Sequence, residues 1–120
     1  MKKERLAVIE KEVARVLSSA LLTEVKNPKI KGIVSITDVR VTDDLKFADV
    51  FVSVLTATGE QQSEENKKSA LNGLEEVKGF LRKKLADNME LRHTPELRIK
   101  LDDSMEYAAK MNELLDKLKG

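Results

Sequence analysis

Phe47-Ala-Asp-Val-Phe-Val-Ser-Val-Leu-Thr56 is the segment from which the architecture of this 120-residue chain follows. Its Val and Phe side chains favour an extended strand, in which successive side chains point to opposite faces. Both faces are apolar, one carrying Ala48, Val50, Val52 and Val54 and the other Phe47, Phe51 and Leu55. A strand that is apolar on both faces belongs in the middle of a sheet, so we expect a neighbouring strand on each side.

Two further segments have strand character, one before and one after this segment. Residues 33–42 are rich in Val, Ile and Thr, and the polar pair Asp43-Asp44 separates them from the central strand, which predicts a hairpin. Residues 97–101 alternate between apolar and basic side chains, as in a half-buried strand with a basic outer face. The sequence therefore predicts a three-stranded sheet.

Helical patterns begin and end the chain. Residues 3–25 carry apolar side chains at three- and four-residue steps. This helix should end before Asn27-Pro28, because a residue that precedes proline avoids the helical region. Residues 103–106 have the spacing of a capping box, and the apolar pattern over residues 107–118 predicts a C-terminal helix.

A long helix is predicted between the second and third strands. Ser63 is a suitable N-cap residue, and residues 70–85 continue with a helical apolar stripe. Gly73 and Gly79 lie inside this helix, where each costs about 1 kcal/mol relative to alanine. We therefore predict that at least one of these glycines marks a bend or a close backbone approach, and we place the bend at Gly79.

The predicted order is α-β-β-α-β-α, with the second helix kinked. A chain of 120 residues is the size of one domain, so we expect a single domain over residues 1–120. The elements predict an α+β fold, with a three-stranded mixed sheet and helices packed against one face of it.

Composition excludes several classes of function. The chain has 22 Lys and Arg against 21 Asp and Glu, a net charge of +1, so any attraction to nucleic acid must come from local segregation of charge. It has no Cys and one His, which excludes thiolate and multi-histidine metal sites. The sequence contains no nucleophile elbow, P-loop or dinucleotide fingerprint, so we expect no enzyme, no catalytic residue and no cofactor.

Three weaker features have simple interpretations. Asp43-Asp44 is a solvated turn rather than a metal site, since no further acid or His motif completes one. His93 lacks a recognisable nucleophile or orienting partner, which favours an exposed loop histidine or one that contacts RNA. The longest uncharged stretch, residues 50–59, is half the length of a membrane-spanning helix, and no signal peptide is evident, so we expect a cytoplasmic protein without membrane attachment.

Charge is segregated along the chain. Residues 32–66, which include the hairpin, hold two Lys and Arg against seven Asp and Glu, whereas residues 67–100 hold nine against five. A basic cluster beside a glycine suits a phosphate backbone, although lysine-rich helix faces are commonly only solvated. The candidate RNA-binding basic residues are Lys78, Arg82, Lys83, Lys84, Arg92, Arg98 and Lys100.

Three segments carry a more specific signal. They are Glu24-Val25-Lys26-Asn27-Pro28-Lys29-Ile30, Val77-Lys78-Gly79-Phe80-Leu81-Arg82 and Leu91-Arg92-His93-Thr94-Pro95-Glu96-Leu97. Together they resemble the bacterial ribosome-binding factor A family. The resemblance implies a type II KH-like fold in which an Ala-x-Gly kink, here Val77-Lys78-Gly79, replaces the Gly-x-x-Gly loop of KH domains. It also adds Gly79 to the candidate RNA-binding residues.

The resemblance implies a function as well. Members of the family bind the immature 30S subunit and 16S ribosomal RNA, and assist late 30S maturation and 16S rRNA processing, including at low temperature, without being enzymes. A functional link to a GTPase assembly factor is implied too, and we expect a monomer. The alternative is a small protein–protein interaction module, in which the acidic hairpin or the last helix binds a partner. An exposed apolar stripe would favour that alternative.

Overall fold

Three helices and three strands make up residues 3–102, the part of the chain that this computed structural model describes. In chain order they are α1 (Lys3–Thr23), β1 (Ile33–Val41), β2 (Phe47–Leu55), α2 (Glu64–Glu76), α3 (Lys78–Asn88) and β3 (Glu96–Leu101). The predicted C-terminal helix and its capping box, residues 103–118, lie outside the described residues.

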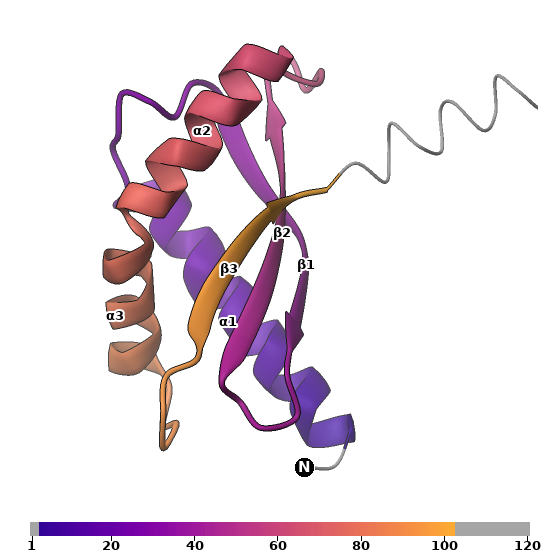
Figure 1. The fold of residues 1–120 in the computed structure, drawn as a ribbon, viewed down its shortest axis with the longest axis vertical. Helices are drawn as coiled ribbons and strands as arrows, with labels where there is room; N and C mark the ends of the chain where they lie inside the picture. The colour runs from indigo at the N-terminus through magenta and orange to yellow at the C-terminus, as the bar shows by residue number, and fades with distance from the viewer. Residues whose placement is uncertain (1–2, 103–120) are drawn as a thin grey trace, which may run out of the picture.

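The sheet has the order β1-β2-β3, so the central position predicted for residues 47–56 is confirmed. β1 pairs antiparallel with β2 as a hairpin, and β2 pairs parallel with β3. The parallel pair requires a crossover, which α2 and α3 supply (Figure 1). The result is a mixed three-stranded sheet in an α+β arrangement, as predicted.

One face of the sheet is buried against the helices. α1 packs against β1, α3 packs against α1, and α2 packs against β3. The strand residues that turn toward the helices are buried, as their alternation predicts, and they meet an apolar stripe on α1 and the inner side of α3. Members of this core include Val13, Leu17, Ala48, Val50, Val52, Leu81, Leu85, Leu97 and Ile99.

The start of the crossover follows from the sequence. Ser63 is the N-cap of α2, and its side chain accepts a hydrogen bond from the backbone N–H of Asn66 at 3.2 Å. This bond satisfies one of the helix's free N–H groups, as predicted.

The crossover helix is broken within the Val77-Lys78-Gly79 segment, where the resemblance implies a kink, but the break lies at Val77, so the placement of the bend at Gly79 is wrong by two residues. Val77 has φ −96° and ψ 6°, and it packs against the core. Gly79 lies within the first turn of α3, where an added Cβ would meet nothing within 4 Å. The break therefore coincides with a β-branched residue that packs against the core, and not with a glycine.

Gly73 serves the other purpose predicted for a helix glycine, close approach. A Cβ added there would lie 2.7 Å from Cγ1 of Ile30 and 3.2 Å from Cβ of Lys29. Both residues belong to the loop between α1 and β1. The missing side chain at Gly73 therefore lets this loop lie directly on α2.

Candidate nucleic-acid interface

A shallow, open depression on the outer side of α3 brings together several of the predicted residues. Its volume is about 460 Å³, and we call it the α3 depression. It is lined by Gly79, Arg82, Lys83, Ala86, Arg92, His93 and Thr94. None of these seven lining residues is acidic, so the depression has the positive character that a phosphate group requires.

Two elements form the walls of this depression. α3 contributes one wall, and the segment between α3 and β3 contributes the other. Nη2 of Arg82 donates a hydrogen bond of 2.9 Å to the backbone carbonyl of Thr94, which fastens the second wall to the first. The next residue, Pro95, is fully buried and anchors the segment at its far end.

Three polar side chains of the depression project into solvent, those of Lys83, Arg92 and His93. All three side chains are exposed, and within residues 3–102 the structure gives them no hydrogen bond or ion pair. A cation without an intramolecular partner can neutralise a phosphate without first breaking a contact. These residues are therefore the part of the depression best suited to a ligand.

Lys78 and Lys84, also predicted as RNA-binding, are engaged elsewhere. Nζ of Lys78 lies 2.7 Å from Oε2 of Glu75, one turn earlier. Nζ of Lys84 lies 2.6 Å from Oε1 of Glu24, and so ties α3 to the end of α1. Neither residue lines the depression, and both side chains are less than one-third exposed.

Arg98 and Lys100 lie on a different face of the molecule from the α3 depression. Their neighbours Leu97 and Ile99 are buried against the helices, so the two basic side chains project from the opposite side of the sheet. The candidate RNA-binding residues therefore do not lie on a single face of the molecule. The alternation of residues 97–101 already carried this signal, because a strand that buries its apolar side must turn its basic side away from the helices.

Contacts on that opposite side engage both cations. Arg98 binds Asp49 through Nε at 2.6 Å and Nη2 at 3.2 Å, and its guanidinium lies 4.4 Å from the ring centroid of Phe47. Nζ of Lys100 lies 3.7 Å from Asp49 and 5.9 Å from the ring of Phe51. The cations thus cover aromatic rings that would otherwise face water. We call this surface the open sheet face.

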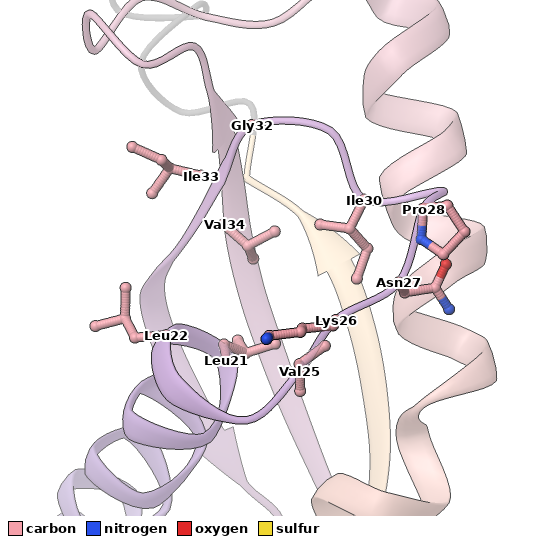
Figure 2. Close-up of a pocket in the computed structure, with 10 residues that line it drawn as sticks. All are labelled: Leu21, Leu22, Val25, Lys26, Asn27, Pro28, Ile30, Gly32, Ile33 and Val34. Atoms are coloured by element: carbon pink, nitrogen blue, oxygen red, sulfur yellow. The ribbon is translucent and has the colours of Figure 1, made fainter.

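A second pocket, of about 560 Å³, lies between the end of α1 and the start of β1 (Figure 2). Seven of its ten lining residues have apolar side chains, and Lys26 is the one charged residue among them. Leu22 and Ile33 are exposed at it, by 74% and 45%. This pocket lacks the cluster of cations that a phosphate backbone needs, and is better suited to apolar groups.

His93 lies among the lining residues of the depression, in the exposed loop position that the sequence predicted. Sequence reasoning missed one contact beside the depression. The contact of the Asn27-Pro28-Lys29 loop with the end of α2 left no signal in local periodicity, because the two segments are distant in sequence.

Among residues 3–102, no group of three or more His, Cys, Asp or Glu side chains could hold a metal ion. Over the same range, no helix is both long and apolar enough to cross a membrane.

Comparison with known proteins identifies the family. The model of the family described as Ribosome-binding factor A matches residues 5–115. Ribosome-binding factor A of Fusobacterium nucleatum subsp. nucleatum is 53% identical over 119 residues, which is 99% of each chain.

Solved structures agree on the fold. The crystal structure of ribosome-binding factor A from Thermus thermophilus matches with a TM-score of 0.67 at 21% identity, covering 80% of this chain and 93% of that one. A Thermus thermophilus homology model, fitted into a cryo-EM map of a complex of that factor with 30S, matches with a TM-score of 0.62 at 20% identity and the same coverage. The match of the family model over nearly the whole sequence, and the high identity to a full-length relative, show that this chain belongs to the ribosome-binding factor A family.

Proposed function

We propose that this protein binds the immature 30S ribosomal subunit and contacts 16S rRNA through the α3 depression. The observation that carries the proposal is the depression itself, with Arg82, Lys83 and Arg92 around one open surface that has no acidic lining residue. Membership of the family supports the ribosome as the target. The homology model placed in a 30S complex map supports the small subunit in particular.

The proposal extends to the role of the complex. The protein assists late 30S maturation and 16S rRNA processing, including at low temperature, and acts by binding rather than by catalysis. It works in the cytoplasm as a monomer, in functional connection with a GTPase assembly factor. The resemblance of the three sequence segments supports this part of the proposal.

The contacts with RNA should be mainly electrostatic. Each phosphate that a cation neutralises releases condensed counterions, so the affinity falls with salt. If the three cations of the depression each meet a phosphate, log affinity should fall with log salt at a slope of about −2 to −3. The engaged cations Lys78 and Lys84, and those of the open sheet face, should add little to this slope.

The test is co-sedimentation with purified ribosomal subunits over a salt series. Mature small, assembly-arrested small and large subunits are compared, first with the native protein. The double variant Lys83→Gln/Arg92→Gln should pellet less at every salt concentration, with a slope shallower by about 1.4 to 1.8. Its control is Lys78→Gln/Lys84→Gln, which removes the same charge from cations that already have partners.

The outcomes separate the possibilities. Selective pelleting with small subunits, weakened mainly in the first double variant, would support the proposed site. Equal weakening of the two double variants would show that net charge matters and the depression does not. Absence of pelleting by the folded native protein at low salt would overturn the proposed function.

A protein–protein interaction module is the second candidate. The exposed apolar pocket at Leu22 and Ile33 favours it, although this pocket lies beside α1 and β1 rather than on the predicted last helix. Under this alternative, Leu22→Asp would abolish partner capture, and Lys83→Gln/Arg92→Gln would leave it unchanged.

A further inference from the structure

Glu76 is the last residue of α2 and directly precedes the break at Val77. Its carboxylate accepts two hydrogen bonds from the loop that follows α1. Oε1 accepts from Nζ of Lys29 at 2.7 Å, and Oε2 accepts from Nδ2 of Asn27 at 3.1 Å. These two bonds lower the pKa of Glu76, the bond from Lys29 having the larger effect. The carboxylate is thus held as an anion by two donors.

The loop that supplies these donors is itself fixed on α2. Oγ of Ser69 donates a hydrogen bond of 2.7 Å to the backbone carbonyl of Lys29. Oδ1 of Asn27 accepts from the backbone N–H of Lys29 at 2.9 Å, which holds the turn around Pro28. Figure 2 shows Asn27 and Pro28 where this loop passes beside the helix. Two turns of α2 therefore contact the loop.

Backbone hydrogen bonds at the break connect α2, which the loop contacts, to α3, which forms one wall of the α3 depression. The backbone N–H of Val77 bonds to the carbonyl of Gly73 at 3.2 Å, and the N–H of Leu81 bonds to the carbonyl of Val77 at 3.0 Å. Arg82 and Lys83 follow Leu81 directly. The direction in which α3 leaves Val77 therefore sets where these two cations stand relative to Arg92 on the other wall.

We propose that Glu76 is a positioning residue for RNA binding, held by Asn27 and Lys29 so that α3 leaves the break in the direction that completes the α3 depression. This inference rests on the proposed function of the depression. It assigns to the Asn27-Pro28-Lys29 loop a role in RNA binding that needs no contact with RNA.

The sign of the effect separates positioning from simple electrostatics. Neutralising Glu76 makes the protein more positive, so if charge alone mattered this change would strengthen RNA binding. If Glu76 positions α3, the same neutralisation weakens binding. The two explanations therefore predict changes in opposite directions.

The experiment measures small-subunit affinity by co-sedimentation at one fixed salt concentration for three variants. Glu76→Gln should bind about threefold to tenfold more weakly than the native protein, as expected for coupled contacts. The double variant Lys29→Glu/Glu76→Lys restores an ion pair at unchanged net charge and should recover part of the loss. Glu65→Gln is the matched control, since it removes the same charge from α2 and should bind at least as tightly as the native protein.

Hydrogen exchange of the Val77 and Leu81 amides supplies a second measurement that does not depend on RNA. Faster exchange in Glu76→Gln, with recovery in the double variant, is the expected result. Equal or tighter subunit binding by Glu76→Gln, while Lys83→Gln/Arg92→Gln weakens binding, would overturn the positioning role and leave the proposed function intact. If the native protein binds no subunit, the proposed function fails, and the positioning role in RNA binding fails with it.

Discussion

Arg98 and Asp49 stand directly opposite each other in the parallel pairing of β3 with β2, and they are joined by two hydrogen bonds, of 2.6 and 3.2 Å. The same guanidinium lies over the ring of Phe47. This relationship joins residues 49 positions apart in the chain, and it makes a basic residue part of the sheet's own structure. A cation so engaged is a poor candidate for binding phosphate.

Arg98→Gln should therefore affect stability more than RNA binding. The substitution removes the cover of Phe47 and the bidentate partner of Asp49, contacts that together stabilise a half-exposed site by about 1 kcal/mol. Urea denaturation should show a loss of that size, whereas co-sedimentation should show small-subunit binding within about twofold of native. A large loss of binding with unchanged stability would show instead that the open sheet face contacts RNA.

The two glycines of the crossover should respond in opposite ways to alanine. Gly73→Ala places a methyl group 2.7 Å from Cγ1 of Ile30, and overpacking of this kind costs about 1 to 3 kcal/mol, which exceeds the gain in helix propensity. Gly79→Ala has open space around its methyl group and should stabilise the protein by about 0.4 to 1 kcal/mol. Thermal and urea unfolding of both variants checks this difference. Equal effects at the two positions would contradict the close approach at Gly73.

A core leucine and an exposed leucine give a second matched pair. Leu85 is fully buried between α3 and the sheet, and Leu85→Ala should lower the free energy of unfolding by about 2 to 5 kcal/mol. Leu22 is 74% exposed, so Leu22→Ala should change that free energy by no more than about 0.5 kcal/mol. Urea denaturation measures both. A large effect at Leu22 would show that the pocket beside α1 is covered in solution.

The hydrogen bonds to Glu76 predict a pH dependence of stability. Lys29 and Asn27 lower the pKa of this carboxyl below its ordinary value of 4.5 in the folded protein. A group whose pKa is lowered on folding stabilises the protein above its unfolded pKa, and this contribution is lost as the pH falls through the folded value. The native protein should therefore lose stability more steeply than Glu76→Gln between about pH 6 and pH 3. Parallel curves in urea unfolding would contradict the assignment.

Local patterns predicted the elements of the fold well. Alternation along residues 47–56 placed β2 at the centre of the sheet, and Ser63 marked the start of α2. These features depend on neighbours within a few residues, where periodicity and capping chemistry act. The same alternation placed Arg98 and Lys100 on the outer face of β3, away from the helices that carry the other cations.

Features that depend on packing between distant segments were not predictable in the same way. The break at Val77 lies two residues from the predicted position. It coincides with core packing of Val77 and with the contact between Glu76 and Lys29, which are 47 residues apart in the sequence. For a similar reason, the sequence could not show which of the candidate cations have a partner within the protein and which do not. Whether Lys84 meets solvent or Glu24 is decided by how α3 packs on α1.

The parallel pairing of β3 with β2 also has a consequence for the order of folding. The β1–β2 hairpin closes over a short turn, whereas β3 can join the sheet only after the chain has traversed α2 and α3. The segment that forms one wall of the α3 depression is held between α3 and β3, and so takes its place only when this last strand is added. During synthesis the acidic hairpin can therefore form early, whereas the α3 depression forms only after β3 has paired with β2. Under the proposed function, only a chain that has added β3 would present this surface to RNA.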